Sequence, residues 1–125
     1  EIAVVAIRVN NGEAIINHLI IGDVKGLKVD RETEQTISGA VFGLFTPNET
    51  IFTAETALLT AESGSDGVFI FESVPYGNWL IKELQPAEHF LPNEEVYPVQ
   101  ITEHKKVIEI TVVNDRIPEI GTNAG

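Results

Sequence analysis

The chain has 125 residues, 43% of them hydrophobic, which is the size of one domain with one core and excludes a disordered chain. Eight basic against 19 acidic residues give a net charge of −11, which leaves no basic face for nucleic acid. No apolar run is long enough to cross a bilayer, so we expect no membrane insertion. The absence of Cys excludes disulfides, Cys-type zinc sites and cysteine nucleophiles. Since Met and a signal peptide are also absent, we expect a piece of a longer protein.

Short runs rich in β-branched and aromatic residues, many of them alternating apolar with polar, are typical of strands. Turn signals such as Asn10-Asn11-Gly12 and Pro75-Tyr76-Gly77 separate these runs. One turn of helix within 54–61 is the other possibility that the sequence offers. Many short strands at this spacing predict an all-β protein, as an antiparallel sandwich or barrel. The predicted strands are 2–9, 14–21, 23–30, 39–45, 57–63, 67–73, 78–84, 96–102 and 107–115.

The two ends of the chain differ from its middle. Residues 1–21 predict a hairpin around Asn11-Gly12, and residues 117–125 have the composition of a linker to a following domain. About twenty apolar-rich residues are not stable in water as a lone hairpin, so we expect the hairpin to pack on the domain or on a second chain. The domain itself is then predicted to span residues 22–116.

Three predicted strands continue an apolar face with one polar side chain: Lys28, Glu83 and Asn114. Each alone is most simply a strand end where the face meets water, because Lys and Glu are rarely buried unpaired. Together they bring an amine, a carboxyl and a carboxamide to one core. Burial in apolar surroundings favours the neutral form of an amine and of a carboxyl group.

A specific reaction becomes possible if the three side chains meet. The neutral Lys28 amine would attack the side-chain carbonyl carbon of Asn114 while Glu83 polarises the carbonyl and transfers protons. Loss of ammonia would leave a Lys–Asn amide. Holding amine and amide in contact supplies the effective concentration, on the order of 7–11 kcal/mol of the barrier at best. The event happens once per molecule, so it is maturation and not turnover.

Five short motifs follow one another in order along the middle of the chain. They are residues 26–33 (GLKVDRET), 39–45 (GAVFGLF), 65–71 (SDGVFIF), 74–83 (VPYGNWLIKE) and 108–114 (IEITVVN). With these motifs, residues 22–116 resemble the Cna protein B-type domain, also called SpaA-like or prealbumin-like, of surface adhesins and pilins in Gram-positive bacteria. The single motifs are loose, but five in order with the right gaps are specific.

The resemblance implies a prealbumin-like, Ig-like antiparallel β-sandwich, with Glu83 as the catalytic acid of an isopeptide crosslink between Lys28 and Asn114. We also expect no cofactor and no metal, and a structural role in place of an enzyme. The expected protein is secreted and attached to the bacterial cell wall, where this domain is a stiff stalk module. Its expected partners are neighbouring domains of the same polypeptide and, through another domain, a host surface ligand.

Some positions depart from the family's pattern. Pro86 comes one position early after Glu83, and residues 96–99 (VYPV) lack the lysine through which pilins polymerise. Residues 117–121 (IPEIG) resemble a sortase signal but have Ile in its fourth position. Asn17 precedes Lys28 by the spacing expected for the closing asparagine of an upstream repeat, so we favour the end of a preceding domain for residues 1–21. A hairpin native to this domain is the alternative.

Two other functions remain open. An adhesive module that itself binds a host ligand would use Phe90, Leu91 and Tyr97, and a β-sandwich appendage of an extracellular enzyme would position a catalytic domain. Metal chemistry has weaker support. The three histidines lack ligand spacing, and the acidic cluster has no ligand periodicity, which favours a solvated face. These residues are His18, His89 and His104, and Asp30, Glu32 and Glu34.

Overall fold

The computed structural model describes residues 4–10, 13–18 and 20–118, with side chains from residue 20 on. All the regular structure in these residues is β-strand, and they contain no helix long and apolar enough to cross a membrane. The expected all-β fold is confirmed. The strands are β1 (Val4–Asn10), β2 (Glu13–His18), β3 (Ile21–Asp30), β4 (Val41–Phe45), β5 (Leu59–Glu62), β6 (Val68–Pro75), β7 (Gly77–Gln85), β8 (Val96–Ile101) and β9 (Val107–Asn114).

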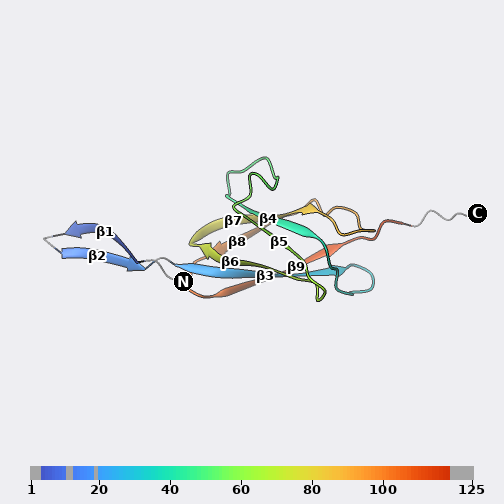
Figure 1. The fold of residues 1–125 in the computed structure, drawn as a ribbon, viewed down its shortest axis with the longest axis horizontal. Helices are drawn as coiled ribbons and strands as arrows, with labels where there is room; N and C mark the ends of the chain where they lie inside the picture. Colours follow the sequence, from blue (N-terminus) through green and yellow to red (C-terminus); the bar gives the residue numbers. More distant parts are fainter. Residues whose placement is uncertain (1–3, 11–12, 19, 119–125) are drawn as a thin grey trace, which may run out of the picture.

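Two sheets form the sandwich (Figure 1). One has the strand order β6-β3-β9 and the other the order β5-β4-β7-β8. All pairs are antiparallel except β3 and β9, which run parallel with Lys28 opposite Val112 and Asp30 opposite Asn114. The sequence did not predict this parallel pair. It places the first and last strands of the sandwich side by side in one sheet.

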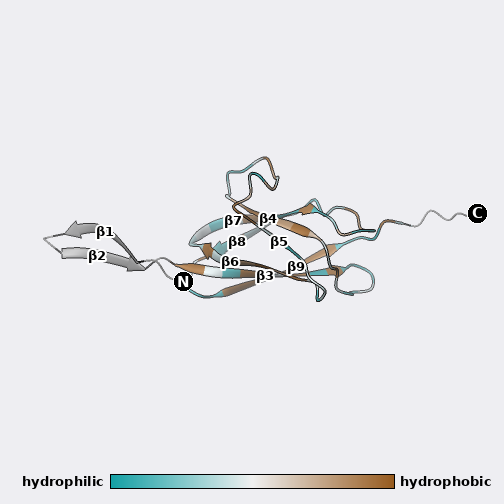
Figure 2. Cartoon of the chain, in the orientation of Figure 1, coloured by the Kyte–Doolittle hydropathy of each residue, from teal (hydrophilic) through white to brown (hydrophobic). Residues whose placement is uncertain are grey.

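Buried and exposed residues alternate along the strands, and the buried ones form the core. Figure 2 shows hydrophobic and hydrophilic residues following one another along both sheets. In β3 the side of Val24, Gly26 and Lys28 is buried while Lys25 and Leu27 are exposed. A Cβ on Gly26 would lie 2.0 Å from the ring of Phe69, so this glycine lets the ring lie against bare backbone. The core consists mainly of the buried residues Val24, Ile37, Phe42, Leu44, Phe69, Phe71, Val74, Ile81, Val99, Ile101 and Val112.

The possible turn of helix within 54–61 is reduced to one hydrogen-bonded turn and does not continue as a helix. The backbone N–H groups of Thr56 and Ala57 both donate to the Thr53 carbonyl, but the hydrogen bonding stops there. The Thr53 and Thr56 side chains bond to nearby backbone groups and close the chain into a turn. Strand β5 then starts at Leu59, two residues later than predicted.

The ends of the chain are described only in part. Strands β1 and β2 pair with each other and, among the described strands, with no other, and they lie beyond the end of the sandwich where β3 begins (Figure 1). The Asn11-Gly12 turn, the Asn17 side chain and most of the predicted linker 117–125 lie outside what the structure describes. The chain enters the sandwich at β3 and leaves it after β9 at the opposite end of the long axis.

Candidate functional site

Three strands bring Lys28, Glu83 and Asn114 together between the two sheets. Lys28 lies on β3 and Asn114 on the neighbouring β9, whereas Glu83 reaches them from β7 in the facing sheet. The exposed fractions are 0% for Lys28, 6% for Glu83 and 2% for Asn114. The strand faces that carry these three side chains therefore point into the core, as the alternation along the strands predicted. We call these three residues the Lys28 cluster.

Glu83 lies between the other two side chains. Its Oε2 is 3.6 Å from the Lys28 Nζ, an ion pair longer than a hydrogen bond. The Asn114 Nδ2 donates to both carboxyl oxygens of Glu83 at 3.2 Å. One carboxyl group thus faces the amine and the amide nitrogen at once, which is the geometry for moving a proton between them.

Aromatic rings form the apolar wall beside the amine. The Lys28 Nζ lies 5.9 Å from the centroid of the Phe42 ring, and that ring stacks on Phe69 at 3.8 Å. Phe42 is also the register partner of Glu83 across β4 and β7. The strand pairing that positions the carboxyl group therefore also positions the ring against the amine.

Burial changes the chemistry of the amine. It lowers the pKa of Lys28 from 10.5 to about 8, and the nearby Glu83 carboxylate opposes part of this shift. About a tenth of the amine is then neutral and nucleophilic at pH 7. The Lys28 Nζ and the Asn114 Oδ1 are buried with no hydrogen-bond partner, and His104 Nε2 is the one other such atom in the described side chains. Buried polar atoms without a hydrogen bond are rare, and each needs an explanation.

The loop between β7 and β8 adds contacts that the sequence did not reveal. The backbone N–H of Asn93 donates to Glu83 Oε1 at 2.7 Å, and the Leu91 carbonyl accepts from Asn114 Nδ2 at 2.9 Å. Nothing in the local pattern marks either residue, because backbone groups carry these contacts. The one available signal is that an unusually long loop follows the strand of Glu83.

A second buried polar group lies two residues further along β3. Asp30 Oδ1 accepts from the backbone N–H groups of Glu32 and Thr33, and Oδ2 accepts from Arg116 Nη2 at 3.2 Å. Chiefly the Glu32 N–H lowers the pKa of the Asp30 carboxyl. The Arg116 guanidinium also lies 4.8 Å from the Phe90 ring. We call Asp30, its two backbone donors and Arg116 the Asp30 cluster.

The weaker candidates from the sequence do not assemble into sites. The described residues contain no group of three His, Cys, Asp or Glu residues that could hold a metal ion. Glu32 and Glu34 are exposed, and Asp30 faces the other way into its own cluster. His104 accepts from the Ile21 N–H at 3.3 Å, His89 is exposed, and the His18 side chain lies outside the described residues.

The adhesive patch of the alternative function does not form either. Phe90 is buried at 8% exposed, and the hydroxyl of half-buried Tyr97 accepts from Asn93 Nδ2. Leu91 alone of the three is exposed. Phe90 packs inward because its segment pairs with Arg116 as the chain leaves β9. The hypothesis of an apolar binding surface built from these three residues is therefore wrong.

Comparison with known proteins agrees with this architecture. A family model described as the SpaA prealbumin-like fold domain matches residues 22–116. No curated protein matches the chain. Similar solved structures include the Bacillus anthracis TIE protein, with 19% identity, a TM-score of 0.69 and coverage of 93% of this chain and 25% of that one.

Two pilins among the solved structures also have a similar fold. The minor pilin GBS52 of the Gram-positive pathogen Streptococcus agalactiae is 18% identical, with a TM-score of 0.67 and coverage of 94% of this chain and 61% of that one. A streptococcal ancillary pilin is 26% identical, with a TM-score of 0.63 and coverage of 81% and 31%. This chain thus spans less than two thirds of each of these structures. Because the family model covers most of the chain, the protein belongs to the SpaA prealbumin-like fold domain family.

Proposed function

We propose that this chain is a stalk module of a cell-wall-anchored surface protein or pilus, stabilised by an isopeptide bond between Lys28 and Asn114. The observation that carries the proposal is the Lys28 cluster itself. An amine and an amide lie buried on either side of one carboxyl group, and the amine nitrogen and the amide oxygen have no hydrogen-bond partner. A covalent bond between the two side chains removes the charged state of the amine, which is the form that burial penalises.

The reaction begins from a neutral amine. The Lys28 Nζ attacks Cγ of Asn114 and forms the new C–N bond, and the nitrogen then gives up one proton to the Glu83 carboxylate. The Cγ–Nδ2 bond breaks as Glu83 delivers that proton to Nδ2, which leaves as ammonia. The carboxyl group ends as it started, and no cofactor or enzyme is needed. Amine and amide are held in place by folding, which supplies the effective concentration.

The position of the bond fits a module under tension. Force enters at the start of β3 and leaves after β9, at opposite ends of the sandwich. A bond between Lys28 and Asn114 carries that force directly from β3 to β9 and bypasses residues 29–113. The two strands are already neighbours in one sheet, so the bond would join adjacent strands.

The same proposal assigns the domain boundaries, partners and location of the module. We assign residues 22–116 to the domain, residues 1–21 to the end of a preceding repeat with Asn17 as its acceptor, and residues 117–125 to a linker. The separate pairing of β1 with β2 supports the second assignment. Its partners are neighbouring domains of the same polypeptide, and its location is the cell wall of a Gram-positive bacterium. The pilins among the similar structures support this location.

Pulling single molecules of the full chain by its two ends tests this function. In the crosslinked wild type, residues 29–113 carry no force whether they are folded or not. They should therefore add nothing to the extension of the chain. Lys28→Met keeps the length and apolar stem of the side chain but has no amine, and it should unfold and release roughly 300 Å of chain. Lys25→Ala, which changes an exposed lysine on the opposite face of β3, should behave as the wild type. Equal extension of the wild type and Lys28→Met would contradict the proposal.

A further inference from the structure

The loop between β7 and β8 contacts both sides of the reaction. The Asn93 N–H donates to Glu83 Oε1 at 2.7 Å, the shortest hydrogen bond that this carboxyl group makes. Two residues earlier, the Leu91 carbonyl accepts from Asn114 Nδ2 at 2.9 Å. Residues 91–93 therefore fix the orientation of the proton-transferring carboxyl and of the amide that loses its nitrogen.

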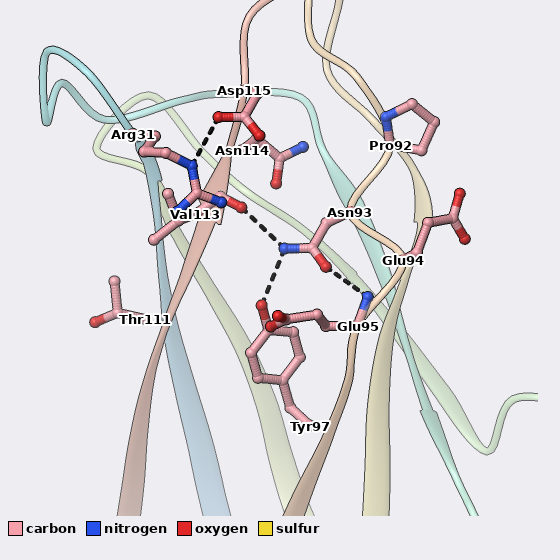
Figure 3. A pocket seen from close by; sticks show the side chains of 10 residues that line it. All are labelled: Arg31, Pro92, Asn93, Glu94, Glu95, Tyr97, Thr111, Val113, Asn114 and Asp115. Carbon is pink, nitrogen blue, oxygen red and sulfur yellow. Dashed lines mark hydrogen bonds and ion pairs between the residues drawn. The ribbon is translucent and has the colours of Figure 1, made fainter.

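The Asn93 side chain ties this loop to both sheets, as Figure 3 shows. Its Nδ2 donates to the Tyr97 hydroxyl on β8 and to the Val113 carbonyl on β9, both at 2.9 Å. Its Oδ1 accepts from the Glu95 N–H at 2.7 Å. Every hydrogen-bonding atom of the side chain is thus in use, and the bond to Val113 is next in sequence to the reacting Asn114.

We propose that Asn93 is a positioning residue for the Lys28–Asn114 crosslink, an inference that rests on the proposed function. Its side chain holds the loop, and the loop holds the Glu83 carboxyl between the amine and the leaving nitrogen. The Leu91 carbonyl turns the Asn114 amide so that Nδ2 faces the carboxyl group. Misplacement of reacting groups by about 1 Å can slow a reaction by about a hundredfold.

The same loop borders a pocket that reaches the site. The pocket has a volume of about 300 Å³ and is lined by Asn93, Tyr97 and Asn114 among others (Figure 3). It provides a route by which ammonia can leave from Asn114. Replacement of Asn93 by a smaller residue widens this route, so a slower reaction in such a variant reports lost positioning and not blocked release.

The kinetics of ammonia loss test the proposal. The full chain is made by chemical synthesis, kept unfolded in acid and refolded at a pH near 8, the Lys28 pKa. Samples are stopped with acid, and intact mass gives the fraction that is lighter by one ammonia. Asn93→Ala should react on the order of tenfold more slowly or worse. Tyr97→Phe, which removes only the hydroxyl that accepts from Asn93, should react a few-fold more slowly than the wild type.

Glu94→Gln is the matched control in the same loop, because its side chain is 82% exposed and forms an ion pair with Lys82, away from the Lys28 cluster. It should react at the wild-type rate. The pH dependence of the rate of ammonia loss distinguishes two causes of a slower Asn93→Ala variant, lost positioning of Glu83 and looser packing around Lys28. Lost positioning lowers the maximal rate and leaves the midpoint at the Lys28 pKa, whereas water reaching the amine would move the midpoint upward.

The outcomes distinguish the two proposals. A wild type that never loses ammonia overturns the crosslink and the role of Asn93 together. A wild type that loses ammonia, with Asn93→Ala equally fast or slowed only through a shifted midpoint, overturns the role of Asn93 alone. If Asn93→Ala does not fold, Tyr97→Phe decides, and a wild-type rate for that variant overturns the positioning role.

Discussion

Two polar clusters lie side by side in this sandwich, each around a buried side chain of β3, and they differ in one respect. Lys28 and Asp30 lie on the same face of β3, and the exposed fractions are 0% and 3%. Both Asp30 oxygens have hydrogen-bond partners, whereas the Lys28 Nζ and the Asn114 Oδ1 have none. Burial alone does not mark a reactive site. A buried polar group with satisfied partners stabilises the fold, whereas one left without a hydrogen bond needs an explanation, which for Lys28 and Asn114 is the proposed bond.

The largest expected effect comes from removing the crosslink. Lys28→Met fills the same space without an amine, so the bond cannot form. By the chain-entropy estimate for closed loops, a loop of about 90 residues stabilises the fold by roughly 4–5 kcal/mol. Lys28→Met should therefore melt at a lower temperature and be cut faster by trypsin. Thermal melting followed by circular dichroism checks this, and unchanged melting would contradict it.

The two clusters should also respond to pH in different ranges. Asn114→Ala keeps Lys28 and Glu83 but removes the acceptor, so the amine remains. The Lys28 pKa is about 8 folded against 10.5 unfolded, so the unfolded chain holds this proton more tightly. The free energy of unfolding should rise by about 3 kcal/mol as the pH rises between these values.

Chemical denaturation of Asn114→Ala across this pH range measures the rise. The Lys28→Met/Asn114→Ala double variant is the reference, because the other lysines and Tyr97 titrate equally in both chains. The wild type should show no such rise, since its Lys28 nitrogen is an amide. An equal pH dependence of Asn114→Ala and the double variant would show that the Lys28 pKa is not lowered.

A smaller effect is expected from the Asp30 cluster. Asp30→Asn turns an NH₂ group toward Arg116 and should lower the melting temperature by less than Lys28→Met does. Its mass should still be lower by one ammonia, because this cluster takes no part in the reaction. The lowered Asp30 pKa stabilises the wild type above the ordinary pKa of a carboxyl, and this contribution is lost in acid.

Arg31→Ala is the control for this substitution. It removes a pair with Asp115 in which both side chains are more than half exposed, so little change is expected. Intact mass and thermal melting of both variants check the prediction. A full sequence mass for Asp30→Asn would mean that the two clusters act as one.

The sequence predicted the parts of this molecule that depend on alternation. The inward direction of Lys28, Glu83 and Asn114 follows from strand parity, and a family resemblance gave each side chain its role. The parallel pairing of β3 with β9 was not predictable, because short strands carry no mark of their neighbours. Asn93 was missed for a similar reason: its contacts join positions that only the packed sheets bring together.

The intact mass of the denatured wild type tests the central claim most directly. The account predicts a mass lower than the sequence mass by one ammonia, and fragment spectra in which a peptide containing Lys28 is joined to one containing Asn114. Glu83→Gln should fold and keep the full mass, because the proton transfer is lost. A full mass for the wild type, or an ammonia loss that persists in Lys28→Met, would contradict the claim.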